Sequence, residues 1–223
     1  MPPSPAFSPT AIGTVYGVLL NDADALARLA PAFDKPPYKA APRAPILYIK
    51  PRNTFAEDGA VVAIPADPGL VRIDATVGAV ISRAATRVSQ ERALAHVAGY
   101  VIASDVTLPH DDYYRPAIAQ RCRDGFCPIG PLQAAGGGFD PAGAEIAVRI
   151  NGIEVHRRSL ARLVRQLPRL IADVSEFMTL SENDILLLGG PDHAPLARPG
   201  DQVTIDVDGL GQLRHSLRLE TLT

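Results

Sequence analysis

The sequence has little cysteine, little net charge and no long apolar run. Its 223 residues include two cysteines, Cys122 and Cys127, and the formal net charge is −2. So small a net charge favours binding to neither nucleic acid nor an anionic membrane. No apolar run approaches the roughly 18–20 residues that a membrane-spanning helix needs. We therefore expect no nucleic-acid partner and no membrane partner.

The two cysteines are separated by four residues, and no second Cys or His pair accompanies them. This is a poor signature for zinc. The N-terminal sequence MPPSPAFSPTA lacks the charged region and the continuous apolar stretch of a secretory signal. A disulfide is geometrically possible, but without an export signal we expect a cytoplasmic protein with two reduced, partly buried thiols.

The sequence contains enough apolar residues to form the core of one large domain. Hydrophobic residues make up 47% of the chain and charged residues 21%, which suits a well-filled core. We expect an N-terminal extension over residues 1–45, packed on a main domain over residues 46–223. The extension has a loose tail (1–10), a strand (13–20), a helical patch (23–32) and a proline-rich arm (35–45).

The main domain shows more strand patterns than helix patterns, so we predict an α+β fold dominated by β-structure. Ser89 is placed to cap a helix over 90–96, and Pro168 to begin a helix over 168–178. Asn151-Gly152, between two alternating runs, is a strong hairpin signal. Further strands are expected at 46–50, 70–81, 99–105 and 185–188, and as a pair within 202–219 joined by residues 208–211.

The strand at 70–81 has two different faces. Val71, Ile73 and every second residue to Ile81 form an apolar face, whereas Arg72, Asp74, Thr76 and Gly78 form the other. The second face either lines a polar site or is a solvated outer face, and periodicity alone does not decide between them.

The stretch from residue 99 to 131 gathers most of the reactive groups. An apolar strand leads to Asp105, and a polar turn with His110 and Arg115 follows, before a basic loop with Arg121 and Asp124. A buried carboxylate needs a partner, and Asp74 with Asp105 could supply oxygens to a hard divalent cation. His110 is a candidate proton carrier. Candidate clamps for a carboxylate are Lys50, Arg52, Arg115, Arg121 and Arg123.

Several collinear motifs resemble the fumarylacetoacetate hydrolase family. They are GYVIASDV (99–106), FCPIGP (126–131), VRING (148–152), FMTL (177–180), PGDQV (199–203) and GLGQL (209–213). Three longer segments, at 41–55, 105–118 and 122–131, resemble one branch of it. That branch is the N-terminal half, or separate N-terminal subunit, of the bifunctional isomerase/decarboxylase of 4-hydroxyphenylacetate (homoprotocatechuate) breakdown.

The resemblance implies a β-roll with peripheral helices and a divalent cation, Mg²⁺ or else Mn²⁺ or Ca²⁺, chelated by a 2-oxo acid. It matches the metal ligands to Asp74, Thr76 and Asp105, and the family's lysine to Arg121. Together with the residue chemistry above, we predict substrate binding by Lys50, Arg52, Arg115, Asp124 and Gly190, and catalytic roles for His110 and Arg121. The implied substrate is a small unsaturated oxo-dicarboxylate, and the implied assembly is a homodimer or a hetero-oligomer with the C-terminal-type sister subunit.

The sequence departs from the family pattern in the pocket. Thr76 and Arg121 stand where the family has a glutamate and a lysine, and LGGP (188–191) replaces a Thr-Gly-Thr-Pro segment. With two carboxylates the site should bind a cation weakly or not at all. Three hypotheses follow: a metal-dependent decarboxylase/isomerase subunit, a non-catalytic partner of a sister subunit, or another family hydrolase or hydratase of small oxo acids.

Overall fold

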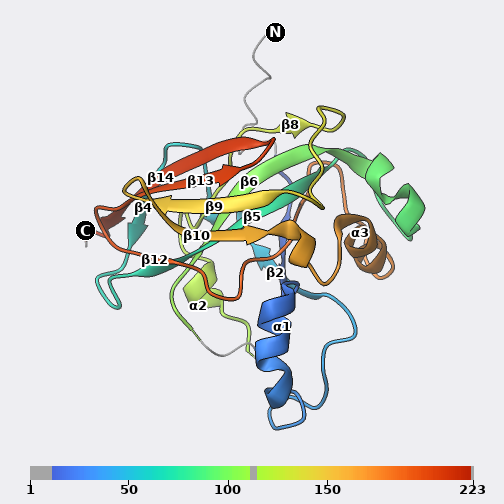
Figure 1. Cartoon of the computed structure of the whole chain (residues 1–223), viewed down its shortest axis with the longest axis horizontal. Coiled ribbons are helices and arrows are strands. Elements are labelled where there is room, and N and C mark those ends of the chain that lie inside the picture. Colours follow the sequence, from blue (N-terminus) through green and yellow to red (C-terminus); the bar gives the residue numbers. More distant parts are fainter. Residues whose placement is uncertain (1–11, 111–114, 222–223) are drawn as a thin grey trace.

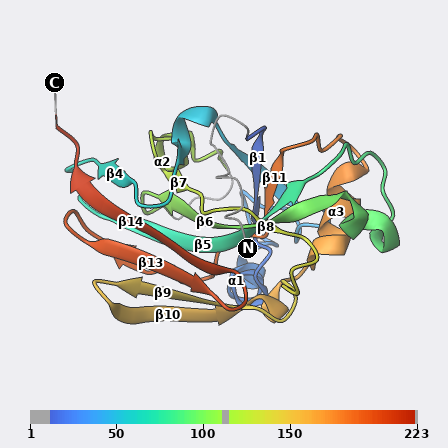
Figure 2. The ribbon, with the colours of Figure 1, turned by 90° about the horizontal axis from the view of Figure 1, so that it is seen from above.

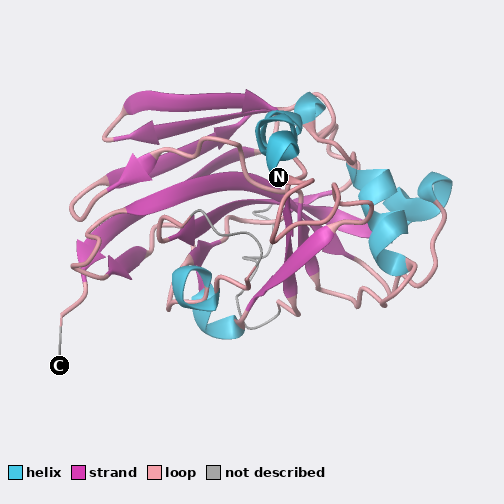
Figure 3. Ribbon diagram, turned by 90° about the horizontal axis from the view of Figure 1, so that it is seen from below, coloured by secondary structure: helices cyan, strands magenta, loops and turns pink. Residues whose placement is uncertain are grey.

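The computed structural model describes residues 12–110 and 115–221. In these ranges it has two main sheets stacked face to face, with α3 (Leu167–Ser175) at one end (Figures 1 and 2). Figure 3 shows that helices are few and peripheral, which confirms the predicted β-dominated fold. The predicted loose tail (1–10) lies outside the described residues. No helix in the described ranges is long and apolar enough to cross a membrane.

The first sheet carries the candidate site. Its seven described strands run in the order β2 (Ile46–Lys50), β1 (Val15–Leu19), β11 (Ile185–Leu187), β5 (Val71–Ile81), β6 (Val97–Thr107) and β8 (Gln133–Ala134), with β12 (Leu196–Ala197) paired to β5. β1 is parallel to β11 and antiparallel to β2. A strand of the predicted extension therefore lies inside this sheet, between two strands of the main domain.

The second sheet covers one face of β5 and β6. Its five described strands are β10 (Ile153–Ser159), β9 (Glu145–Ile150), β13 (Gln202–Val207), β14 (Gly211–Leu219) and β4 (Val61–Ile64). The predicted Asn151-Gly152 hairpin joins β9 to β10, and both turn residues have positive φ. A short pair, β3 (Phe55–Ala56) with β7 (Cys127–Pro128), completes the described strands.

β5 and β6 are buried on both faces, which decides the role of the polar face of β5. Ile73, Val77 and their neighbours on one face join the large core between the two sheets. On the other face, Val80 from β5 and Val101 from β6 belong to a smaller apolar cluster. Asp74 and Thr76 lie on this second face and are buried. The face is therefore a lined interior and not a solvated outer surface.

The helices lie close to their predicted positions, but several are 3-10 helices and not α-helices. α1 (Ala23–Leu29) continues into a 3-10 turn at Ala30–Ala32, and α3 begins near Pro168 as predicted but ends three residues early. The predicted helix at 90–96 is a 3-10 helix, and the Ser89 side chain makes no capping hydrogen bond to it. The remaining helical segments are the 3-10 turns Arg52–Thr54 and Leu160–Arg162, and α2 (Ile118–Arg121).

Candidate active site

Two buried carboxylates meet on the interior face of the first sheet. Asp74 on β5 is the direct cross-strand partner of Asp105 on β6, and directly opposed side chains have Cβ atoms about 5 Å apart. Asp74 is 3% exposed and Asp105 is 2% exposed. The sequence prediction that separate strands bring these two groups together is consistent with this register.

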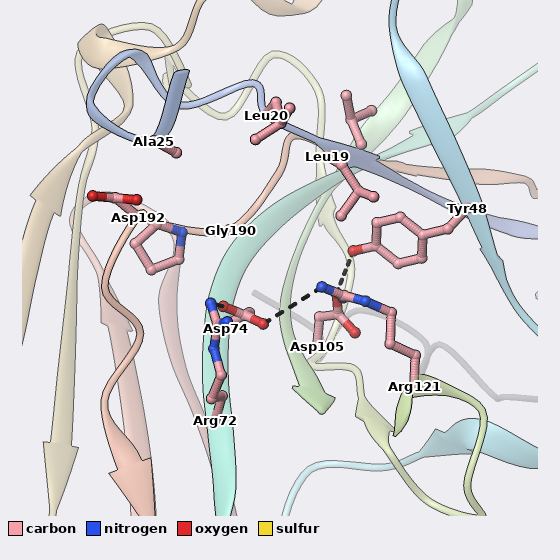
Figure 4. Close-up of a pocket in the computed structure, with 12 residues that line it drawn as sticks. Leu19, Leu20, Ala25, Tyr48, Arg72, Asp74, Asp105, Arg121, Gly190 and Asp192 are labelled. Atoms are coloured by element: carbon pink, nitrogen blue, oxygen red, sulfur yellow. Dashed lines mark hydrogen bonds and ion pairs between the residues drawn. The ribbon is translucent and has the colours of Figure 1, made fainter. Parts of the chain in front are cut away.

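Positive side chains surround the pair. The Lys50 ammonium lies 2.8 Å from Asp105 Oδ1, and Arg121 Nη1 lies 2.6 Å from Asp105 Oδ2. Arg72 Nη2 lies 3.2 Å from Asp74 Oδ1. The Tyr48 hydroxyl also donates to Asp105. We call these six residues the charged cluster: Tyr48, Lys50, Arg72, Asp74, Asp105 and Arg121 (Figure 4 shows all of them except Lys50).

The charged cluster contains three cations and two carboxylates. Lys50 is held further by the carbonyl oxygens of Val106 (3.2 Å) and Arg121 (2.7 Å). The Arg121 guanidinium stacks over the Tyr48 ring, with its carbon 4.6 Å from the ring centroid, a favourable cation–π geometry. Lys50 and Arg121 are therefore both fixed beside Asp105.

The two carboxylates differ in acidity. Burial alone would raise the pKa of Asp105, but Lys50, Arg121 and the Tyr48 hydrogen bond outweigh it, and the pKa lies below its ordinary value. Burial raises the pKa of Asp74, and Arg72 and Arg121 offset only part of that rise. Burial, together with Asp105, holds the pKa of Tyr48 well above 10. Asp105 therefore stays ionised, whereas Asp74 takes up a proton more readily.

Two neighbouring cavities adjoin the cluster. A small one of about 30 Å³ is lined by Arg72, Asp74, Asp105 and Gly190, among others. A chamber of about 390 Å³ is lined by β2 residues such as Ile49, by His110, and by Arg115, Ile118 and others between 115 and 122. Leu19, Tyr48 and Arg121 line both cavities. The chamber has the size of a small-molecule site, and Arg121 is at its boundary with the carboxylate pair.

The structure brings most of the predicted site residues to these cavities. Gly190 lies against Asp74, and a Cβ there would come within 3.0 Å of the Asp74 Cβ. Lys50 binds Asp105 directly and lines neither cavity. Arg52 and Asp124 also line neither cavity, and Asp124 accepts a hydrogen bond from Asn53. The polar turn between His110 and Arg115 lies outside the described residues.

The residues in this arrangement do not fit a divalent cation. Both oxygens of Asp105 are engaged, because Lys50 pairs with Oδ1 and both Arg121 and Tyr48 donate to Oδ2. Asp74 Oδ2 lies 4.0 Å from Arg121 Nη2 and accepts no hydrogen bond from the described residues. The Thr76 hydroxyl donates to the Gly189 carbonyl at 2.9 Å. A hard cation needs about six oxygen ligands, and the described residues hold no group of three or more His, Cys, Asp or Glu placed to bind a metal.

Three residues that contribute to the candidate site were not predicted from the sequence. Tyr48 shares a face of β2 with Lys50, so alternation in the segment ILYIK could have indicated it. Arg158, buried behind the site, donates to the carbonyls of Ala75 (3.1 Å) and Gly189 (2.5 Å). Burial lowers the pKa of Arg158 to about 10, so it stays charged at neutral pH. The third contributor is Gly17.

Gly17 on β1 is the register partner of Tyr48 on β2, and the Tyr48 ring lies over it. An added Cβ would overlap the ring and its hydroxyl. We expect Gly17→Ala to displace Tyr48 from Asp105 and Arg121 and to lower the free energy of unfolding by about 1–3 kcal/mol. Urea unfolding followed by circular dichroism measures this. Gly143→Ala, where an added Cβ meets no atom within 4 Å, is the control, and equal stability of the two variants would contradict the prediction.

Comparison with known proteins places the chain in a family. The model of the fumarylacetoacetate (FAA) hydrolase C-terminal domain matches residues 14–218. The chain belongs to the fumarylacetoacetate hydrolase family. The prediction of membership in this enzyme family is thereby confirmed, and the matched region includes β1 from the predicted extension.

Individual relatives indicate which enzymes the chain resembles. A 4-hydroxyphenylacetate degradation bifunctional isomerase/decarboxylase from Salmonella dublin is 38% identical over 208 residues, which are 93% of this chain and 48% of the relative. The chain thus spans about half the length of that protein. The crystal structure of 5-carboxymethyl-2-hydroxymuconate delta-isomerase from Mycobacterium smegmatis has a TM-score of 0.80 and 27% identity, covering 95% of this chain and 81% of that one.

A third relative concerns the metal. Fumarylpyruvate hydrolase from Pseudomonas aeruginosa, crystallised with Mn²⁺ and pyruvate, has a TM-score of 0.80 and covers 94% of this chain and 91% of that one. Its 24% identity supports the shared fold alone. That protein holds Mn²⁺ on this fold, whereas the donor set of the present chain departs from what such an ion needs.

Proposed function

We propose that the chain is a subunit of an isomerase/decarboxylase that acts on unsaturated 2-oxo di- or tricarboxylates from aromatic catabolism, in the manner of 4-hydroxyphenylacetate breakdown. The observation that carries the proposal is the 390 Å³ chamber with His110 and Arg115 in its lining, which meets the charged cluster at Arg121. The likeness to an isomerase/decarboxylase and to an isomerase supports it.

The residues of the chamber suggest a division of roles. Arg115 and Arg121 would bind the carboxylates of the substrate, since guanidinium groups pair with carboxylates in a fixed geometry. His110 would carry a proton between carbons of the dienol, because its ordinary pKa lies near neutrality. Ile49 and Ile118 would contact the unsaturated carbon chain. Lys50 would act by holding Asp105 and the end of α2.

The predicted cation (Mg²⁺, Mn²⁺ or Ca²⁺ at Asp74, Asp105 and Thr76) is not part of this proposal, because Lys50 and Arg121 already engage Asp105 and the Thr76 hydroxyl donates to Gly189. The proton transfer proposed for His110 does not depend on such an ion.

A steady-state assay with 5-carboxymethyl-2-hydroxymuconate tests the proposed roles. We expect His110→Gln to lower kcat by roughly 10²-fold, the typical contribution of a positioned acid or base. We expect Arg115→Gln to raise KM about tenfold through loss of a charged hydrogen bond. Arg92→Gln, on the exposed side of the 3-10 helix at Gln90–His96, is the control. No turnover by the wild-type chain with or without Mg²⁺, alone or with a sister subunit, would remove the catalytic proposal.

A second candidate is a non-catalytic partner in a hetero-oligomer with a C-terminal-type sister subunit. The engagement of both Asp105 oxygens by cations of the chain itself favours it. Co-expression followed by size-exclusion chromatography separates the two functions. A complex whose activity is unchanged by His110→Gln favours the partner role, whereas the absence of any hetero-complex contradicts it and leaves the predicted homodimer.

A further inference from the structure

Arg121 occupies the position between the two carboxylates. Its Nη1 lies 2.6 Å from Asp105 Oδ2, and its Nη2 lies 4.0 Å from Asp74 Oδ2 (Figure 4). The residue is the last of α2 and is 6% exposed. One guanidinium therefore balances charge on both strands at once, a task that a bound cation performs in a site built from carboxylates.

Several contacts fix the guanidinium in this position. The Tyr48 ring supports it from one side, and the same tyrosine donates to Asp105. Lys50, whose side chain is fully buried, donates to the carbonyl of Arg121 itself and so holds the end of α2. Gly17 leaves the room that the Tyr48 ring needs. The residue is held by its backbone, its ring partner and its ion pair, so displacing it disrupts all three.

We infer that Arg121 is a built-in cation that excludes divalent metal from the Asp74–Asp105 pair and makes the adjoining chamber a metal-independent site for a small 2-oxo acid. A divalent ion at the pair would meet Arg72, Lys50 and Arg121 at short range, and like charges repel strongly in a water-poor site. An anion in the chamber would meet Arg121 and Arg115 instead. The exclusion of metal stands apart from the proposed function, whereas the choice of a 2-oxo acid rests on it.

Titration of the intact chain with Mn²⁺ tests the exclusion. Electron paramagnetic resonance counts free Mn²⁺ and so gives a dissociation constant without any activity. We expect the wild-type chain to bind no Mn²⁺ at this pair at millimolar concentration. Arg121→Gln, which removes the charge and keeps a polar side chain, should bind Mn²⁺ at least about tenfold more tightly, because the cation that opposes the ion is gone.

Two variants assign the bound ion. Adding Asp74→Asn to Arg121→Gln should abolish the gained Mn²⁺ site. Arg123→Gln, two residues away and paired to Glu220 on the surface, should behave as wild type. Mn²⁺ binding by the wild-type chain that Asp74→Asn removes would overturn the inference, and so would a folded Arg121→Gln variant that binds no more tightly than wild type. If Arg121→Gln fails to fold, the wild-type titration still decides.

Pyruvate serves as the probe for the anion. Saturation-transfer NMR should show equal binding of pyruvate to the wild-type chain in EDTA and in Mn²⁺. Binding that appears only with Mn²⁺ overturns metal independence. Absence of pyruvate binding in both conditions, together with no Mn²⁺ at the pair, leaves the exclusion intact and counts against the proposed function.

Discussion

Asp105→Asn is expected to lower the free energy of unfolding by about 3–5 kcal/mol, the usual cost of removing one partner from a buried ion pair. The asparagine keeps the shape of the side chain but loses the charge that Lys50 and Arg121 face at 2.8 Å and 2.6 Å. Both cations would stay buried without their anion, and the amide group cannot accept at both of its ends. Chemical unfolding in urea at pH 7 gives the difference directly.

Glu220→Gln provides the matched control for Asp105→Asn. Glu220 pairs with Arg123 at 2.5 Å, but both side chains are about a third exposed. Exposed pairs contribute about 0–1 kcal/mol, so the control should unfold close to wild type. A loss below about 1 kcal/mol for Asp105→Asn would show that the charged cluster is solvated or able to relax, and the account of a dry ion-paired site would fail.

The second large effect is a loss of stability in acid through His215. This residue lies on β14 and is 3% exposed, with Nε2 3.0 Å from the Ser104 hydroxyl on β6. Burial lowers its pKa to about 4, whereas an unfolded histidine titrates near 6.5. Between these values the unfolded chain binds the extra proton, so stability is complete above about pH 6.5 and falls by about 3 kcal/mol as the pH drops to 4.

Unfolding free energies measured at several pH values between 7 and 4 test this dependence. His215→Gln should be less stable at pH 7 but should lose less stability on acidification, because the buried imidazole is absent. His193→Gln, whose native side chain is 80% exposed, should keep the wild-type slope. Parallel slopes for wild type and His215→Gln would mean that carboxylates alone cause the acid sensitivity.

Alternation and turn signals predicted the strands well because they depend on local chemistry. The segments at 46–50 and 70–81 and the Asn151-Gly152 hairpin are strands and a turn in the structure. The pairing of β1 with β11, by contrast, joins residues about 170 positions apart, and periodicity carries no information about partners. The apolar cluster on the polar face of β5 includes Val15 from β1 and Ile185 from β11, so the sequence left the burial of that face open.

The sequence predicted the two carboxylates of the candidate site, but not which cations would pair with them. Asp74 and Asp105 stood out because a carboxylate is unusual beside apolar strand residues. That Lys50 would bind Asp105 could not be inferred, since β2 and β6 are separated in the sheet by three strands, β1, β11 and β5. Nor could the sequence show that Arg121, at the end of a four-residue helix, would turn inward to the same oxygen pair.

The position of β1 also bears on the order of events during synthesis. β1 and its antiparallel partner β2 are both synthesised early, whereas the parallel partner β11 follows only at residues 185–187. Such distant pairings close large loops and form slowly. Most of the chain would then have to be synthesised before Asp105 is brought beside Tyr48 and Lys50 on β2. The charged cluster would therefore assemble among the last parts of the molecule. A nascent chain halted before residue 185 should expose that strand pair to chaperones.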